Sequence, residues 1–146
     1  MKKKLLALLV TACSLTLTGC AGAPAGSTPP ESTATGGTEK SAYHKITAQE
    51  AKEMIDGGNV TVVDVRTAEE YAEAHIPGAV LVPNESIGSE APEALPDKDA
   101  VLVVHCRTGV RSKQASDKLV GLGYTNIYDM GGIVDWTYET ESGAAQ

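Results

Sequence analysis

The fold follows from one stretch of sequence, Val101-Leu102-Val103-Val104-His105-Cys106-Arg107-Thr108-Gly109-Val110-Arg111-Ser112. It opens with four consecutive aliphatic residues, which predicts a strand buried on both faces, because a half-exposed strand would alternate apolar and polar residues. After Cys106 the apolar run stops, and a short loop with a glycine and two arginines follows. From Ser112 onward, apolar residues recur at helical spacing. The stretch therefore predicts a buried strand, a tight loop and the start of a helix.

The loop between this strand and helix is an expected anion site. Backbone N–H groups at a helix start have no partner within the helix, and the helix dipole favours negative charge there. Cys106 lies at the rim of the expected site, which would favour its thiolate, the nucleophilic form of cysteine. Arg107 and Arg111 add positive charge nearby. We therefore predict that Cys106 is a nucleophile rather than a small core residue.

Short strands and helices alternate around this central stretch. Thr47 with Glu50, and Thr67 with Glu70, have the capping-box spacing that begins a helix. We expect strands at 44–46, 60–65, 80–82, 101–106 and 126–129, helices beginning at Thr47, Thr67 and Ser112, and a last short helix at 133–138. Residues 84–99 are expected to form a loop or a short helix. This order predicts an α/β fold with a mostly parallel sheet and helices on both faces.

The N-terminus has the features of an export signal. A basic start, Met1-Lys2-Lys3-Lys4, precedes an apolar run over 5–17 that is too short to span a membrane stably. Leu17-Thr18-Gly19-Cys20 then resembles a bacterial lipobox. We predict a lipoprotein signal peptide at 1–19, with lipid attached to Cys20. An ordinary secretory signal is the alternative, and a second near-match ends at Cys13.

Composition divides the rest of the chain. Residues 20–42 are rich in Gly, Pro, Ser, Thr and Ala without hydrophobic periodicity, which predicts a flexible linker after the lipidated cysteine. The folded domain is expected at 43–138, where about 95 residues can hold one modest core. A loose polar tail is expected at 139–146. The protein would then lie in the cell envelope, outside the cytoplasm, anchored by lipid to a bacterial membrane.

The cysteines and the charge limit the possible functions. With Cys13 removed and Cys20 lipidated, Cys106 is the one remaining thiol, so no intramolecular disulfide can form in the mature chain. The full chain has 12 basic and 19 acidic side chains, a net charge of −7, and loss of Lys2, Lys3 and Lys4 makes it −10. This balance argues against nucleic acid and against a polybasic membrane patch, and favours a small anion as ligand.

Several motifs together resemble a single-domain rhodanese. They are Asp64-Val65-Arg66-Thr67-Ala68-Glu69-Glu70-Tyr71, His75-Ile76-Pro77-Gly78-Ala79, the loop 106–112, Gly123-Tyr124, and Met130-Gly131-Gly132-Ile133 with Trp136. They follow the family's order over nearly the whole folded region. The resemblance implies a cofactor-free, monomeric sulfurtransferase. A sulfane sulfur would pass from a small anionic donor such as thiosulfate to Cys106, and then from the persulfide to a thiol or cyanide-like acceptor.

Carried over by position, the resemblance also assigns the site residues. Cys106 would be the nucleophile, and the amides and side chains that surround its sulfur and bind the donor would be those of Arg107, Thr108, Gly109, Val110, Arg111 and Ser112. A persulfide anion within a ring of N–H donors is stabilised as an oxyanion would be. The two arginines would engage the donor and help sulfite leave.

Other polar residues are expected to have structural roles. Asp64 and Arg66 follow a strand and would brace the loop. His75 lies in a turn beside a proline and is expected to be structural. His105 should point to the strand face opposite Cys106, so it should not act as its base. No pair of Cys or His residues has metal-ligand spacing, and no metal is expected.

Two further functions are compatible with parts of the sequence. The pattern His105-Cys106 followed by Arg111-Ser112 superficially resembles Cys-dependent phosphatases and arsenate reductases. Only four residues separate Cys106 from Arg111, however, and the phosphatase loop needs one more to encircle a phosphoryl group. A sulfur-carrier or docking module without turnover is the other alternative.

Overall fold

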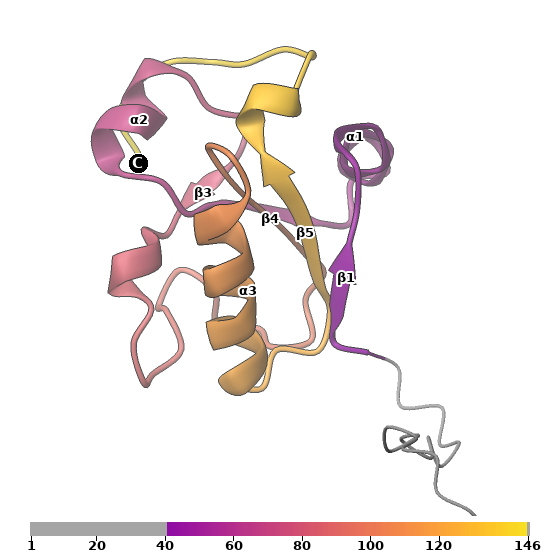
Figure 1. The fold of residues 1–146 in the computed structure, drawn as a ribbon, viewed down its shortest axis with the longest axis vertical. Helices are drawn as coiled ribbons and strands as arrows, with labels where there is room; N and C mark the ends of the chain where they lie inside the picture. The colour runs from indigo at the N-terminus through magenta and orange to yellow at the C-terminus, as the bar shows by residue number, and fades with distance from the viewer. Residues whose placement is uncertain (1–40, 146) are drawn as a thin grey trace, which may run out of the picture. The chain divides into compact units, whose positions relative to one another are not determined.

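The computed structural model describes residues 41–145 and contains one central parallel sheet (Figure 1). Five strands lie in the order β1-β5-β4-β2-β3, and every neighbouring pair is parallel. The strands are β1 (Tyr43–Lys45), β2 (Thr61–Asp64), β3 (Val80–Leu81), β4 (Leu102–Cys106) and β5 (Ile127–Gly132). The predicted signal peptide, the predicted lipid site Cys20 and the predicted linker up to residue 40 lie outside the described residues.

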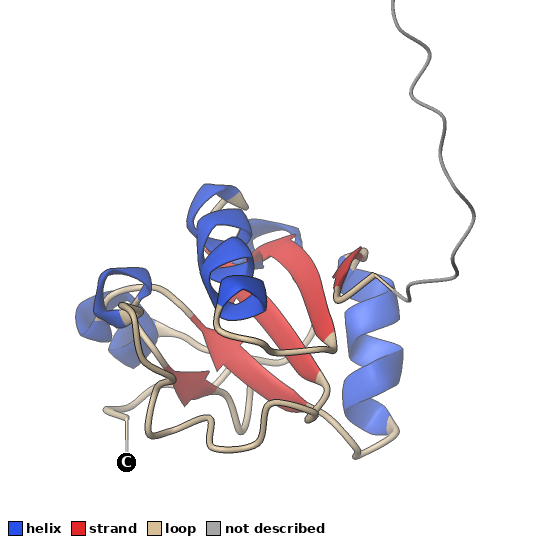
Figure 2. Cartoon of the chain, turned by 90° about the horizontal axis from the view of Figure 1, so that it is seen from below, coloured by secondary structure: helices blue, strands red, loops and turns tan. Residues whose placement is uncertain are grey.

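Helices cover both faces of the sheet, as predicted (Figure 2). They are α1 (Ala48–Asp56), α2 (Ala68–Glu73) and α3 (Val110–Gly121), with single 3₁₀ turns η1 (Asn84–Ser86) and η2 (Ile133–Asp135). Ala115 and Leu119 of α3 belong to the core on one face, whereas Ala51 of α1 and Tyr71 of α2 belong to the core on the other. Each helix in the described part is too short or too polar to cross a bilayer.

Strand β4 is the centre of the fold, and all of its residues are buried. This burial confirms the prediction from the uninterrupted apolar run. Because side chains alternate along a strand, Val104 and Cys106 pack into the core beneath α3, while Val103 packs into the opposite core. The sheet is therefore packed on both sides directly below the loop that follows β4.

Both predicted capping boxes are present. The Thr47 side chain accepts a hydrogen bond from the backbone N–H of Glu50, and the Glu50 carboxylate accepts one from the backbone N–H of Thr47. Thr67 and Glu70 form the same reciprocal pair at the start of α2. These side chains satisfy N–H groups that would otherwise have no partner at the helix start.

Two predicted helix boundaries are wrong. Helix α3 begins at Val110 rather than Ser112, after Gly109 in the left-handed conformation. Apolar periodicity marks the buried face of a helix, and the first two residues of α3, Val110 and Arg111, are not buried. The expected helix at 133–138 is only the turn η2. Beyond η2 the backbone becomes extended at Trp136, whose indole N–H donates to the Glu139 carbonyl at 3.0 Å.

The described part of the C-terminal segment, residues 139–145, contacts the domain, whereas a loose polar tail was expected at 139–146. Glu141 and His75 form an antiparallel bridge with two backbone hydrogen bonds of 2.8 and 2.9 Å. The backbone N–H of Gly143 donates to the Ala72 carbonyl at 3.0 Å, and that of Gly78 donates to the Glu141 carboxylate at 3.1 Å. The described part of this segment therefore packs against α2 and the turn that follows it.

Candidate active site

Cys106 ends the central strand, at the sheet edge where the carboxyl ends of parallel strands meet. Ligands of open parallel sheets bind at this edge. The side chain is only 1% exposed, so it lies at the floor of the loop and not at its rim. The backbone N–H of Gly109 donates to Cys106 Sγ at 3.1 Å. A nucleophile is therefore held beneath the loop, beside the first turn of α3.

The loop has this shape because of two local features. Gly109 adopts a φ of 102°, which a residue with a Cβ rarely does, and this turn aims its N–H at the sulfur. Ser112 is fully buried, and its hydroxyl donates to the Gly109 carbonyl at 3.0 Å. Ser112 was expected to contact the donor, but in the structure it holds the loop backbone. It therefore positions the Gly109 amide.

The end of β5 supports the loop from the other side. A Cβ on Gly132 would lie 2.6 Å from the Arg107 carbonyl oxygen and 2.9 Å from Thr108 Cα. The backbone N–H of Val134 also donates to the Arg107 carbonyl at 3.3 Å. From the sequence, Gly131-Gly132 is notable only as part of a motif that resembles the rhodanese family. The structure shows that the loop can approach β5 this closely because position 132 has no side chain.

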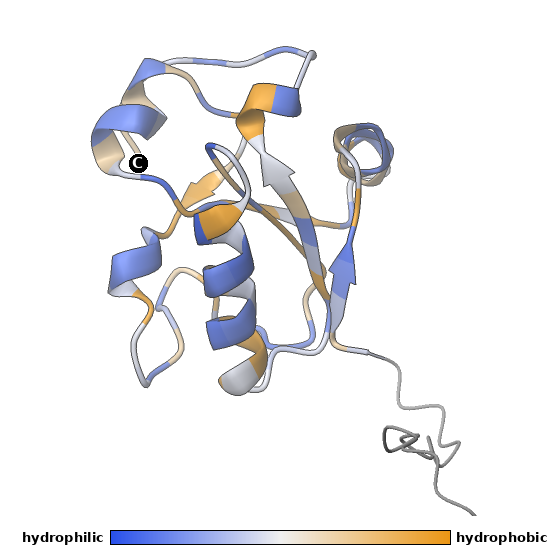
Figure 3. Cartoon of the chain, in the orientation of Figure 1, coloured by the Kyte–Doolittle hydropathy of each residue, from blue (hydrophilic) through white to orange (hydrophobic). Residues whose placement is uncertain are grey.

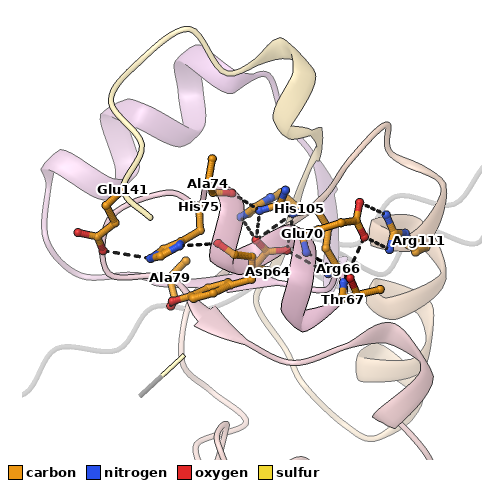
Figure 4. Close-up of polar contacts among 11 residues, drawn as sticks. Asp64, Arg66, Thr67, Glu70, Ala74, His75, Ala79, His105, Arg111 and Glu141 are labelled. Carbon is orange, nitrogen blue, oxygen red and sulfur yellow. Dashed lines mark hydrogen bonds and ion pairs between the residues drawn. The ribbon is translucent and has the colours of Figure 1, made fainter. Parts of the chain in front are cut away.

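Arg111 forms an ion pair with α2 (Figure 4). Its Nη1 and Nη2 donate to the two Glu70 oxygens at 2.7 and 2.9 Å. The bidentate guanidinium lowers the pKa of Glu70 to about 2, and the carboxylate raises the pKa of Arg111. From the sequence, Arg111 is expected to bind the donor and Glu70 only to cap α2. The structure brings the two together, so the charge of Arg111 is largely neutralised.

The remaining loop side chains face solvent. Arg107, Thr108 and Val110 are exposed. Arg107 takes part in none of the ion pairs found within residues 41–145. It is therefore the loop's cation that is available to an anionic ligand.

Asp64 and Arg66 form a buried ion pair beneath the site. Arg66 Nε donates to both Asp64 oxygens at 2.9 and 3.0 Å, and Nη2 donates to Oδ2 at 2.6 Å. Nη2 also donates to the Ala74 carbonyl at 2.6 Å, which ties the end of β2 to the end of α2. Because both charges are buried and satisfied, they fix the position of α2 and of Glu70 on it.

His105 and His75 do not face Cys106. The ring of His105 is fully buried on the other face of β4, with Nε2 3.8 Å from Asp64 Oδ2, and burial lowers its pKa. His75 stacks on the Tyr71 ring with centroids 3.7 Å apart, and its Nδ1 lies 2.8 Å from the Tyr71 carbonyl. Its Nε2 lies 3.3 Å from the Glu141 carboxylate. Both histidines belong to the packing that supports α2 and β4.

A family model of the rhodanese-like domain matches residues 47–139. This match spans strands β2 to β5, both capping boxes and the loop over Cys106. The chain belongs to the rhodanese-like domain family. The predicted α/β fold is thereby confirmed, and solved structures agree. A rhodanese-like domain protein from Staphylococcus aureus is 32% identical with a TM-score of 0.58, over 69% of this chain and 99% of that one.

Two kinds of curated relatives are similar to this chain over part of its length. Thiosulfate sulfurtransferase PspE of Escherichia coli (strain K12) is 36% identical over 73 residues, which are 50% of this chain and 70% of that protein. The tRNA uridine(34) hydroxylase of Yersinia pestis is 31% identical over 98 residues, which are 64% of this chain but 28% of that enzyme. A structure described as rhodanese with anions from E. coli is 32% identical, with a TM-score of 0.51 over 57% of this chain and 98% of that one.

Proposed function

We propose that this rhodanese-like domain is a sulfurtransferase that moves a sulfane sulfur from thiosulfate or a similar donor to a thiophilic acceptor. The observation that carries the proposal is the backbone amide of Gly109 directed at the sulfur of a buried cysteine, at the start of α3. The similarity to thiosulfate sulfurtransferase PspE supports the same reaction. The E. coli rhodanese determined with anions supports an anionic ligand.

The reaction has two balanced halves. The Cys106 thiolate attacks the sulfane sulfur of thiosulfate, a sulfur–sulfur bond forms, and sulfite leaves with the electron pair of the bond that breaks. An acceptor such as cyanide or a thiolate then attacks the outer sulfur, and Cys106 leaves as the thiolate. The sulfur at Cys106 is anionic both in the thiolate and in the persulfide, and in both states it lies within reach of the loop amides. Removing one such donor from a transition state typically costs about 2.7–4 kcal/mol.

Intact-mass analysis after incubation with thiosulfate tests the first half. We expect a gain of one sulfur atom, which peptide mapping should locate on Cys106 rather than on Cys13 or Cys20. The gain should be absent in Cys106→Ser. A wild-type chain that gains no sulfur from thiosulfate or from a similar sulfane donor would contradict the proposal. Stoichiometric persulfide without turnover on cyanide or thiols would instead identify a sulfur carrier.

The same loop disfavours phosphoryl chemistry. Four residues separate Cys106 from Arg111, and Arg111 is held by Glu70 rather than left free to bind a tetrahedral anion. We expect hydrolysis of aryl phosphates and reduction of arsenate to be negligible beside sulfur transfer. Comparable rates on an aryl phosphate would overturn this expectation.

We also propose that lipid on Cys20 anchors the protein in the cell envelope, outside the cytoplasm. The pattern Leu17-Thr18-Gly19-Cys20 after a basic and apolar start supports this proposal. Expression in a bacterium followed by membrane fractionation tests it. The wild type should sediment with membranes, and Cys20→Ser should be released or remain unprocessed. Normal processing and membrane retention of Cys20→Ser would contradict lipid attachment at this residue.

A further inference from the structure

The charges around the active loop are poorly matched to a dianion. The bidentate contact with Glu70 neutralises Arg111 and raises its pKa, and the charge of Glu85 makes a smaller contribution in the same direction. On the other side of the loop, exposed Asp135 lines a pocket together with Thr108 and Gly109. Carboxylates therefore lie on both sides of the loop, and Arg107 is the one loop cation without an ion-pair partner within residues 41–145.

Lys45 does not change this balance substantially. It lines the same pocket as Thr108, Gly109 and Asp135, but its ammonium lies 3.4 Å from the buried carboxylate of Asp129. Its charge is shared with a carboxylate that has no access to solvent. A ligand with two negative charges would therefore meet about one free cation at this loop. Its second charge would lose hydration on binding without gaining a partner, which is unfavourable.

Apolar side chains flank the same loop. Val110 is 65% exposed and Val134 is 62% exposed, and these two are the most exposed large hydrophobic residues in the described part of the chain. Val110 is in the first turn of α3, and the backbone N–H of Val134 in η2 donates to the Arg107 carbonyl. Figure 3 shows hydrophobic colour at the first turn of α3 and at η2, on either side of the loop. We call Val110 and Val134 the apolar rim.

We propose that the apolar rim and the Glu70–Arg111 pair make this site selective for a monoanionic organic sulfane donor, such as a thiosulfonate, over thiosulfate. The inference rests on the proposed sulfurtransferase function and specifies its donor. One negative charge suits the one available cation, and an organic group can cover exposed valine surface that an inorganic anion cannot. Glu70, Val110 and Val134 thereby become specificity-determining residues.

The chemical step at Cys106 is the same for both donors. The thiolate attacks the sulfane sulfur of the thiosulfonate, and the bond between that sulfur and the sulfonyl sulfur breaks. The electron pair leaves with a monoanionic sulfinate, and Cys106 holds the persulfide anion. Thiosulfate would instead release dianionic sulfite at a loop whose Arg111 is already paired with Glu70. The organic leaving group therefore avoids repulsion that sulfite would meet.

The charge part of the proposal is tested with thiosulfate and methanethiosulfonate, which are similar in shape and differ by an anionic oxygen in place of a methyl group. Each kcat/KM is divided by the donor's rate with a free thiolate, so that intrinsic reactivity cancels. Glu70→Gln preserves a capping box, because Gln serves at this position, but it removes the negative charge. We expect it to raise the thiosulfate to methanethiosulfonate ratio by roughly three- to tenfold. Glu50→Gln, in the other capping box, should leave the ratio unchanged.

The apolar part is tested with benzenethiosulfonate and methanethiosulfonate, which carry the same charge. The double variant Val110→Thr, Val134→Thr keeps the shape of both side chains and makes the rim polar. We expect it to lower the preference for benzenethiosulfonate by roughly three- to tenfold. The effect is limited because the apolar rim is open to solvent and covers only part of the ring. Val120→Thr, near the far end of α3, is the matched control and should leave this preference unchanged.

The proposal is overturned if either ratio stays at its wild-type value in the corresponding variant. Because each readout compares two donors on one protein, a general loss of folded enzyme moves neither ratio. If thiosulfate still adds sulfur to Cys106 while the ratios stay constant, the sulfurtransferase function stands and only the donor preference fails. If none of the three donors adds sulfur to Cys106, both proposals fail.

Discussion

Single residues decide whether the loop can close over Cys106, and Gly132 is the clearest example. Its position admits no Cβ, because the Arg107 carbonyl and Thr108 Cα occupy the space. The backbone at Gly132 is otherwise ordinary, with a φ of −103°. The glycine is therefore required by a contact between distant segments rather than by its own conformation.

We expect Gly132→Ala to lower the free energy of unfolding by about 1–3 kcal/mol, as overpacking does, and to reduce sulfur transfer because the loop is displaced. Urea unfolding and a thiosulfate assay measure the two effects. Gly88→Ala is the control, since a Cβ there meets nothing within 4 Å, and it should change neither quantity appreciably. Equal stability and activity of the two variants would show that the loop moves away from the added Cβ without loss of stability or of sulfur transfer.

The buried pair of Asp64 and Arg66 makes a second residue-scale prediction. Asp64→Asn leaves the Arg66 guanidinium buried without its counter-charge, which we expect to lower the free energy of unfolding by about 3–5 kcal/mol. Denaturant unfolding measures the loss. Asp56→Asn breaks the exposed Lys52–Asp56 pair and should change the stability little. A small effect of Asp64→Asn would mean that water reaches Arg66.

At the scale of elements, α2 is short but holds the site through Glu70. The same carboxylate caps its own helix and binds Arg111 at the start of α3. Because the pKa of Glu70 is lowered to about 2, its stabilising contact is fully present above the pKa of an unfolded glutamate, near 4.5. It is lost as the pH falls through about 2.

Comparison of the wild type with Glu70→Gln should show this dependence. We expect the difference in unfolding free energy to be largest near neutral pH and to shrink steadily as the pH falls below about 4.5 toward 2. Urea titrations at a series of pH values measure it. Glu50→Gln, whose carboxylate has no arginine partner, should give a smaller difference. A difference between wild type and Glu70→Gln that is constant with pH would argue against the ion pair in solution.

At the scale of the whole molecule, the C-terminal segment closes the domain over α2. The Glu141–His75 bridge and the Gly143–Ala72 hydrogen bond join it to residues that precede β3. The carbonyl of Ala74, next to His75, accepts a hydrogen bond from Arg66. The residues that the segment contacts are therefore adjacent to one that binds the buried Asp64–Arg66 pair. We therefore expect the segment to hold α2, and with it Glu70, in place.

Deletion of residues 139–146 should lower the free energy of unfolding by about 1–3 kcal/mol, because several backbone hydrogen bonds are lost. Amide hydrogen exchange should also become faster in α2 than in α3. Glu141→Ala is a narrower variant that keeps the backbone bridge and should have part of the effect. Unchanged exchange in α2 after the deletion would show that the segment does not restrain this helix.

The sequence by itself determined the features that depend on neighbouring residues. An uninterrupted aliphatic run specified a strand buried on both faces, and β4 is buried throughout. Thr47 with Glu50 and Thr67 with Glu70 specified two helix starts, because a capping box acts over three residues. The order of strands and helices specified a parallel sheet covered on both sides, and the motifs specified the family.

Only the tertiary structure determined which distant side chains contact one another at the site. Arg111 pairs with Glu70 across 41 residues of sequence, which turned an expected donor-binding cation into a neutralised one. The close approach of Gly132 to the loop and the docking of Glu141 on His75 likewise join segments far apart in the chain. Residue spacing reports periodicity and local hydrogen bonding, whereas the partner of a charge depends on which strand ends meet at one edge of the sheet. That edge forms only when the sheet has assembled.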